Sequence, residues 1–459
     1  MLSEIFQPFV KESPISVMVG GLLARVFSPD EIDHLFEVNA QRQYTKELLF
    51  STLFDLMSKV VCGIRPSVHA AYQATSEEIA VSITSVYNKL NATETGISAA
   101  LVRYSAAQLA PVIEHLGGSL EPLLPGYRVK ILDGNCIEAS EHRIEELRYT
   151  NAGALPGKSL VVYDPSLKLA LDVFPCEDGH AQERALLDPV LSSVEPGDLW
   201  IADRNFCIRK MLLGIADRGG YFLIREHKKL AWQAMSPLAE VGETDTGVVY
   251  EQVISIEDDN GQRLPLRRIV LVLDRPTRDG ETQIVLLTNV PSESASACEL
   301  ADLYRSRWLI EGAFQELAEH LSSEINTLGY PRAALFGFCV ALIASNVLSV
   351  VKAALRSVHG LEKIEEEVSG YYIADEIAGT YRGMMIAIPV VHWTIFSVLT
   401  EVELVAVLRE LAGRVRLSAF KKHRRGPKKK PPRRSSNKRE PHVSTARLIA
   451  HRRARNKTP

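Results

Sequence analysis

Three acidic residues, Asp133, Asp203 and Glu311, stand in sequence contexts that favour a shared site. Asp133 follows the predicted strand 127–132, and Asp203 follows the apolar segment LWIA. Carboxylates at the ends of neighbouring strands can point into one crevice of an α/β sheet. Each aspartate alone is explained as well by the start of a turn. A third carboxylate on a nearby helix favours a site made of all three, with oxygen ligands of the kind that Mg²⁺ prefers.

The predicted helix around Glu311 carries a tyrosine and an arginine on the same face. Tyr304, Arg307 and Glu311 are separated by three and four residues. At about 100° per residue, Arg307 lies about 40° and Tyr304 about 20° from Glu311 around the helix axis. Apolar residues such as Ile310 and Leu317 occupy the rest of the buried side. This polar stripe at the edge of a core is what a functional carboxylate on a helix requires.

The segment YRSRWLIEGAFQELA resembles the C-terminal signature of the insertion-sequence-four family of DDE transposases. That signature is Tyr, two residues, Arg, three residues, Glu, six residues, Lys. The sequence supplies Tyr304, Arg307 and Glu311, and departs from the pattern at Ala318, where the family usually has lysine. The departure puts substrate positioning in doubt and leaves the three carboxylates in place. Gln315, one turn after Glu311, is a neutral residue that could partly replace the lysine.

Two further motifs extend the resemblance over roughly residues 125–350. DGN at Asp133 and ADRNF at Asp203 resemble the two aspartate motifs of the family. FLIREHK, with Arg225 and Lys228, resembles the basic strand that follows the second aspartate. Three motifs in matching order are a specific signal, whereas a lone Asp-Gly or Asp-Arg pair would be weak.

The resemblance implies a ribonuclease-H-like fold in which Asp133, Asp203 and Glu311 bind two Mg²⁺ ions, with Mn²⁺ as a substitute. Two such ions can activate a nucleophile and stabilise the leaving oxygen of a phosphodiester. The implied activity is cleavage of the ends of a mobile element and their joining to target DNA, by a homodimer in the bacterial cytoplasm at the nucleoid. The candidate DNA contacts are Tyr304, Arg307, Arg204, Arg225 and Lys228.

Two alternative functions remain open at the level of sequence. One is a two-metal DNA nuclease without strand transfer, and the other is an inactive, transposase-derived DNA-binding protein. His180 and Glu183 could lie beside the site, although a helix start explains them almost as well. Trp232 could stack on an extruded base, but a packing role is the favoured interpretation.

The elements around these motifs predict an α/β fold. A ribonuclease-H-like core is interrupted by a β-rich insertion, preceded by a helical N-terminal domain and followed by a disordered basic tail. In the N-terminal domain, Ser28 starts a helix, and the segment VSITSVYNKLN within the predicted helix 77–90 suits either DNA reading or an ordinary polar face. The predicted regions are a helical domain expected to bind DNA at 1–120, the catalytic domain at 125–350 with the insertion at about 231–290, a helical region at 351–418, and the tail at 419–459.

The charge of the 459-residue chain is distributed unevenly. Its net charge is −3, yet Lys421 to Pro459 hold 16 of the 53 basic residues and one acidic residue, Glu440. Such a basic tail favours a polyanionic partner and nonspecific phosphate contact. Six cysteines without a CxxC pair give little support to a zinc site or disulfides and fit a reducing cytosol. The uncharged stretch 333–351 is interpreted as a buried core helix in preference to a membrane span.

Overall fold

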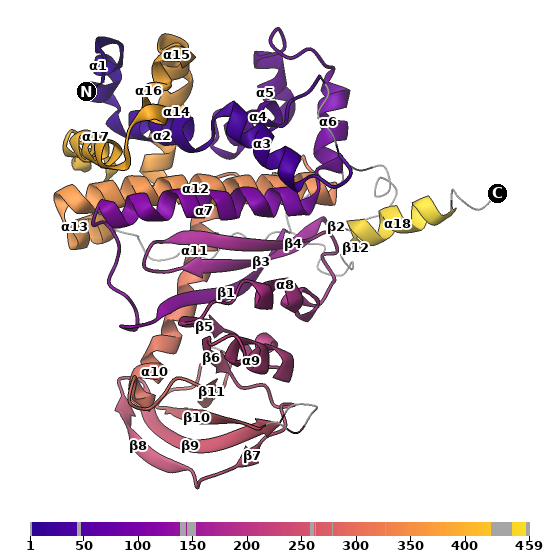
Figure 1. The fold of residues 1–459 in the computed structure, drawn as a ribbon, viewed down its shortest axis with the longest axis vertical. Helices are drawn as coiled ribbons and strands as arrows, with labels where there is room; N and C mark the ends of the chain where they lie inside the picture. The colour runs from indigo at the N-terminus through magenta and orange to yellow at the C-terminus, as the bar shows by residue number, and fades with distance from the viewer. Residues whose placement is uncertain are drawn as a thin grey trace.

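One mixed β-sheet organises the chain, and helices from both ends of the sequence lie together over one of its faces (Figure 1). The computed structural model describes residues 2–43, 47–137, 144, 153–257, 261, 263–277, 279–325, 327–423 and 443–455. In spatial order the ten strands are β4 (Leu169–Cys176), β3 (Gly157–Asp164), β1 (Arg128–Ile137), β5 (Asp198–Ala202), β6 (Tyr221–Arg225), β11 (Gln283–Thr288), β10 (Arg263–Leu273), β9 (Gly247–Glu257) and β7 (Gln233–Ala234), with β8 (Ala239–Thr244) also paired to β9.

The centre of the sheet is parallel and its two flanks are antiparallel. β1 pairs parallel with β5, and β5 pairs parallel with β6, whereas β3 and β4 form an antiparallel flank. β5 is buried along its whole length, as expected for a parallel strand covered on both faces. The predicted strand 127–132, the apolar segment before Asp203 and the basic strand FLIREHK correspond to β1, β5 and β6, except that β1 continues to Ile137 instead of ending at Asp133.

The β-rich segment predicted as an insertion continues this same sheet. β11 pairs antiparallel with β6, with Leu287 opposite Ile224, and β10 and β9 follow outward. The segment therefore shares the hydrogen-bonded ladder of the parallel strands, which places its turns next to the ends of β5 and β6.

Two long helices cover one face of the sheet, α7 (Thr95–His115) and α12 (Pro331–His359). Among the described residues α12 alone is long and apolar enough to cross a membrane, but 83% of its most apolar window is buried inside the protein. It packs against α7 and β4, so it is the central helix of the core. Shorter helices α8 (Leu187–Ser192) and α9 (Arg209–Ala216) contribute to a second apolar cluster on the opposite face, around Trp200 and Phe222.

The N-terminal and C-terminal helices pack into one layer beyond α12, although they are far apart in sequence (Figure 1). Gly20 and Gly21 permit this contact, because a Cβ on either would lie within about 2.5 Å of the rings of Trp393 and Phe396. The layer contains α1 (Gln7–Glu12), α2 (Pro14–Val26), α3 (Pro29–Asn39), α4 (Phe50–Val61), α5 (Val68–Ala74), α6 (Ile83–Ala92), α13 (Leu361–Glu367), α14 (Gly370–Ala387), α15 (Val390–Trp393), α16 (Ile395–Val398) and α17 (Glu401–Gly413).

Helix α6 holds the segment that suited a DNA-reading helix. It begins later than predicted, because the Ser82 side chain caps it by accepting from the backbone N–H of Ser85. Asn88 is exposed, but the ammonium of Lys89 donates to the carbonyl of Leu48 inside the domain. The positive charge of Lys89 therefore stabilises the packing of the helical domain.

Part of the C-terminal tail is ordered, which corrects the prediction of a disordered segment at 419–459. β12 (Val443–Ser444) pairs parallel with β2 (Ala154–Leu155), and α18 (Thr445–Arg455) follows it. Arg447 forms an ion pair with Asp178 at 2.8 Å. Lys422 also donates its backbone N–H to the carbonyl of Glu367. Residues 424–442 lie outside the described residues.

Replacement of Asn346 by alanine should destabilise the junction of α12, α7 and β4. Its fully buried amide accepts from the N–H of Ala170 at 2.8 Å and donates to the carbonyl of Ala170 and to Ser105. Because the substitution leaves buried polar groups without partners, we expect a loss of about 3 kcal/mol in the free energy of unfolding. Chemical denaturation measures it, with Asn88→Ala on exposed α6 as the control. Equal stability of the two variants would contradict this role.

Candidate active site

Asp133 lies in the middle of β1 at the point where parallel pairing ends. Leu132 is the last residue of β1 paired with β5, and Asp133 itself is paired only with Val161 of β3. One carboxylate oxygen accepts from the N–H of Gly134 at 2.8 Å. The prediction that Asp133 ends its strand was wrong, but the residue does lie at the edge of the parallel part of the sheet. Its carboxylate can therefore face residues that follow β5.

Asp203 follows β5 directly, as the sequence predicted. Its carboxylate accepts from the N–H of Asn205 at 2.7 Å and caps a 3₁₀ turn at Arg204–Phe206. Leu132 and Ala202 are opposite each other in the parallel pair, so the residues that follow them in β1 and after β5 are Asp133 and Asp203. The register of two strands thus brings both aspartates to one edge.

The helix predicted around Glu311 consists of three pieces. Helix α10 (Ala297–Tyr304) is followed by a 3₁₀ turn at Arg305–Arg307 and then by α11 (Trp308–His320). The capping box formed by Ser296 and Glu299 starts α10. The tighter turn changes the angular spacing assumed for one continuous helix. Tyr304, Arg307 and Glu311 nevertheless converge on the aspartates.

Arg307 joins the first and third carboxylates. One guanidinium nitrogen donates to Asp133 and another donates to Glu311, both at 2.9 Å. The Arg307 side chain is 11% exposed, and its guanidinium lies 4.7 Å from the ring centroid of Trp308. A largely buried guanidinium is stable only when it is paired with an anion. The two ion pairs therefore restrict the positions of Arg307, Asp133 and Glu311 relative to one another.

Tyr304 fastens the end of α10 to the end of β5. Its buried hydroxyl donates to the carbonyl of Ala202 at 3.4 Å, one residue before Asp203. Burial raises the pKa of Tyr304 well above its ordinary value, so the phenol stays protonated. In this structure the hydroxyl is a positioning group for the β5 end.

The electrostatic state of the site follows from this crowding. The pKa of Asp133 is raised to about 6, chiefly by burial and also by the nearby charges of Asp203 and Glu311. The N–H of Gly134 and the cation of Arg307 act in the opposite direction. Burial makes the Asp133 carboxyl costly to ionise. A positive charge that approaches Asp133 would therefore favour its ionised form.

The three carboxylates fit a hard divalent cation by their donor chemistry, because Mg²⁺ prefers carboxylate oxygens. Asp203 is close enough to Asp133 for its charge to raise the pKa of the Asp133 carboxyl. Among the residues that the structure describes, no group of three or more His, Cys, Asp or Glu side chains is placed so that it could hold a metal ion. Arg307 occupies one oxygen of Asp133 and one of Glu311.

Arg204 and Arg225, two of the three other basic candidates, lie around Asp203. Arg204 follows it directly, and Arg225 ends β6, the neighbouring strand. Both arginines form ion pairs with Glu281, in the turn between β10 and β11. Lys228, three residues beyond β6, is exposed. Arg204 and Arg225 thus share one carboxylate, that of Glu281, which the sequence analysis did not identify as a candidate site residue.

Glu183 is a fourth carboxylate next to the aspartates. Its side chain accepts from Asn205 at 3.4 Å, and an ideal Cβ on Gly134 would lie 2.5 Å from its Oε1. The segment DGHAQER gave only a weak indication of this position. His180, from the same segment, is exposed and donates its backbone N–H to Asp178.

Two residues considered for accessory roles have other partners. The indole of Trp232 donates to Glu226 at 2.7 Å, and the guanidinium of Arg268 lies 5.0 Å from its ring centroid, in agreement with the favoured packing role. Gln315 donates to Glu319 further along α11, whereas Ala318 is exposed. The side-chain amide of Gln315 is therefore hydrogen-bonded within its own helix.

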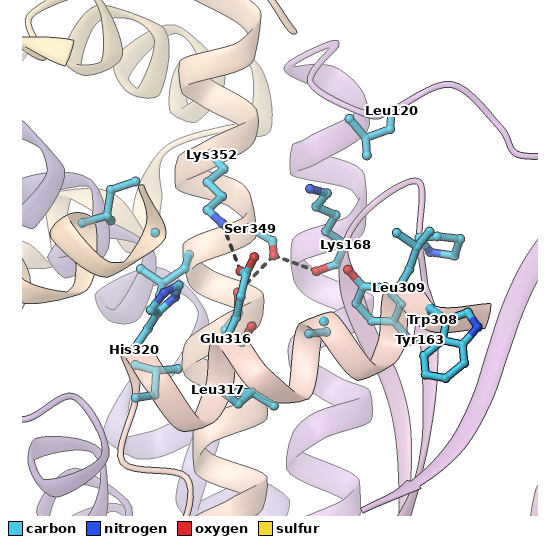
Figure 2. A pocket seen from close by; sticks show the side chains of 18 residues that line it. Leu120, Tyr163, Lys168, Trp308, Leu309, Glu316, Leu317, His320, Ser349 and Lys352 are labelled. Carbon is cyan, nitrogen blue, oxygen red and sulfur yellow. Dashed lines mark hydrogen bonds and ion pairs between the residues drawn. The ribbon is translucent and has the colours of Figure 1, made fainter. Parts of the chain in front are cut away.

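A cavity of about 280 Å³ borders α11 beside the site, and none of the three carboxylates lines it (Figure 2). Glu316 pairs with Lys352 at 3.2 Å, and Ser349 donates to the carbonyl of Lys168, whose ammonium pairs with Glu365. Because these groups satisfy one another, the cavity belongs to the packing of α11 against α12.

The three carboxylates lie within the part of the chain that comparisons with known proteins match. Residues 124–347 match the family described as "Transposase DDE domain". The chain is 28% identical over 170 residues to "Putative transposase y4zB" of Sinorhizobium fredii, which covers 36% of this chain and 44% of that protein. It is 25% identical over 230 residues to "Transposase for insertion sequence element IS421" and to "Putative transposase InsL for insertion sequence element IS186A", both of Escherichia coli, which covers 42% of this chain and 57% of each relative. The chain thus spans about half the length of these relatives.

Replacement of Gly134 by alanine tests the proximity of Glu183. The new Cβ would meet the end of a flexible side chain, so we expect a cost of about 1 kcal/mol in the free energy of unfolding, which Glu183→Ala should relieve in the double variant. Gly118→Ala is the contrasting control, because its Cβ would lie 2.4 Å from the carbonyl oxygen of Ala353 and the backbone must move. A cost for Gly134→Ala that persists without Glu183 would contradict this geometry.

Proposed function

We propose that this chain, whose residues 124–347 match the transposase DDE domain family, is the transposase of an insertion sequence of the insertion-sequence-four family. It cleaves the ends of the element and joins them to target DNA. The observation that carries this proposal is the pair of bonds from Arg307 to Asp133 and Glu311, beside Asp203. They unite the first and third motifs, which are far apart in the sequence, at the edge of the sheet where Asp203 also lies.

The order of the strands supports a ribonuclease-H-like catalytic core. β4, β3 and β1 form an antiparallel meander, and β5 and β6 lie parallel to β1 on its other side. The parallel ends of β1 and β5 then present their carboxylates at one edge, where ligands of α/β sheets commonly bind.

Asp133, Asp203 and Glu311 would hold two Mg²⁺ ions, for which Mn²⁺ substitutes. When bound, the ions supply activation of the attacking water or DNA 3′-OH and stabilisation of the departing oxygen. Arg307 has an oxyanion-binding guanidinium already directed at this point, so a DNA phosphate and the two carboxylates compete for it. Tyr304 fixes the end of β5 and with it the backbone that presents Asp203.

DNA would pass over the basic residues around this edge. Arg204, Arg225 and Lys228 join Tyr304 and Arg307 as the proposed contacts, and the helical domain at 1–120 contributes further binding. Pairing of two element ends requires two active sites, which a homodimer provides. The protein would act in the cytoplasm at the nucleoid, since its substrate is chromosomal DNA.

Ala318 favours a second candidate function. The usual lysine of the signature is absent, and Gln315 is bonded to Glu319 instead. This difference weakens substrate positioning more than metal binding. A two-metal nuclease without strand transfer, or an inactive DNA-binding derivative, is therefore a defined outcome of the following experiment.

Asp133→Asn, Asp203→Asn and Glu311→Gln should each abolish DNA cleavage and leave DNA binding largely unchanged. Each replacement removes one ionised ligand with little change in shape. The assay uses DNA that flanks the gene, Mg²⁺ or Mn²⁺, and a plasmid target, with Glu319→Gln on the same helix as the matched control. Products joined to the target support a transposase. Nicks alone indicate a nuclease, and binding without cleavage by the native chain indicates an inactive derivative. Full cleavage by any of the three variants would contradict the assignment of Asp133, Asp203 and Glu311 as the catalytic residues.

Removal of the basic tail from Arg424 onward should weaken nonspecific DNA binding and flatten its dependence on salt. The slope of log K against log salt is expected to fall by about 0.9 for each DNA phosphate that the tail no longer neutralises. A truncation that begins at Val443 isolates the contribution of β12 and α18. An unchanged salt slope in the longer truncation would count against a role of the tail in phosphate binding.

A further inference from the structure

Two arginines beside Asp203 converge on a single carboxylate. Arg204 donates from one Nη to Oε1 of Glu281 at 2.8 Å, and Arg225 donates from one Nη to Oε2 of the same residue. The three residues come from separate parts of the fold, since Arg204 and Arg225 precede Glu281 by 77 and 56 residues. The contact therefore depends on the antiparallel pairing of β6 with β11, which brings the turn to this edge.

The two arginines lie at the candidate active site. Arg204 is the residue after Asp203, and Arg225 ends β6 directly after Ile224, which pairs with Ala202, the residue before Asp203. The turn that carries Glu281 also borders an open groove of about 580 Å³ whose lining includes Thr277, Tyr304 and Arg305. A strand bound at Asp203 would therefore pass close to these guanidinium groups.

The arrangement matches the recognition of a phosphate. Each carboxylate oxygen accepts from a different arginine, and the two non-bridging oxygens of a phosphodiester can accept in the same way. The side chains of Arg204 and Glu281 are 44% and 30% exposed, so solvent and ligand reach the pair. Partly exposed ion pairs of this kind exchange partners at small cost.

The turn at Thr277–Glu281 does not depend on the Glu281 carboxylate. Thr277 donates its N–H to the carbonyl of Glu281 at 2.8 Å, and the N–H of Glu281 donates to the Thr277 hydroxyl at 3.1 Å. Gly280, with φ at 82°, provides the left-handed residue that the turn requires. The carboxylate can therefore leave the arginines without unfolding its own loop.

We propose that Arg204 and Arg225 form a binding site for one backbone phosphate of DNA, and that Glu281 occupies this site until DNA displaces it. The inference rests on the proposed function, because it takes DNA as the ligand. Glu281 then lowers the affinity of the chain for nonspecific DNA, because a phosphate that binds the two arginines must displace the Glu281 carboxylate. A DNA strand that is held firmly at Asp203 displaces Glu281 and binds the two arginines in its place.

Glu281→Gln in the full-length chain tests this exchange. Binding of a labelled duplex of arbitrary sequence is measured in EDTA over a range of salt concentrations, so that no cleavage is needed. We expect tighter binding by about fivefold and a steeper salt slope by about 0.9, the value for one additional neutralised phosphate. Asp279→Asn is the matched control, since it removes the same charge from the same turn and touches neither arginine in the described hydrogen bonds and ion pairs. Its affinity should stay within about twofold of the native value, because exposed charges are screened by salt.

Two further variants separate local competition from net charge and from folding. Glu281→Asp keeps the charge but is shorter by one methylene, so it should also bind DNA more tightly than the native chain. Addition of Arg204→Gln and Arg225→Gln to Glu281→Gln should abolish the gain. Thermal unfolding of each variant verifies the fold.

The outcomes divide clearly. Unchanged or weaker DNA binding by Glu281→Gln and Glu281→Asp, beside normal binding by the native chain, overturns the proposed role of Glu281 alone. A gain that survives loss of both arginines, or that Asp279→Asn reproduces, also overturns it. Absence of DNA binding in every chain, Glu281→Gln included, contradicts the proposed function together with this inference.

Discussion

The bridge from Arg307 to Asp133 and Glu311 is the interaction on which the candidate site depends. A guanidinium that is 11% exposed cannot remain without an anionic partner, and here it has two. The bridge fixes the start of α11 against β1, although 174 residues separate Arg307 from Asp133. Arg307 is the last residue of the 3₁₀ turn that separates α10 from α11.

The continuous sheet explains why residues of the β-rich segment reach this site. β6 is the last parallel strand, and its antiparallel partner β11 extends the same ladder outward. The turn before β11 therefore lies at the edge that presents Asp203. On the other side, α12 and α7 bury the sheet and leave that edge open. A separate domain joined by a flexible linker could not hold Glu281 at a fixed distance from Arg204.

The basic residues closest to the triad already have acidic partners within the chain. Arg307 is paired with Asp133 and Glu311, and Arg204 and Arg225 are paired with Glu281. Under the proposed function, binding of a phosphate by these arginines would be an exchange of anions. The basic tail would then hold DNA nonspecifically while the site responds to a correctly placed strand.

Short-range features of the site could be predicted from the sequence because they depend on neighbouring residues. The apolar run before Asp203 predicted β5, and the spacing of Tyr304, Arg307 and Glu311 predicted a shared polar face. The end of β1 was placed wrongly, since continued pairing with β3 carries the strand past Asp133 to Ile137. The docking of Val443 and Ser444 beside β2 was missed because only the partner strand gives that short segment a structure.

The sequence by itself determined which carboxylates and cations are available and which local elements carry them. Only the tertiary structure decided their partners. That Arg307 binds Asp133, that Glu281 binds Arg204 and Arg225, and that Glu183 lies over Gly134 depend on strand register and on packing between distant segments. Such contacts leave no periodic pattern in the chain. A surface glutamate in a turn and a glutamate that occupies a phosphate site have the same local sequence, and only the neighbouring strand distinguishes them.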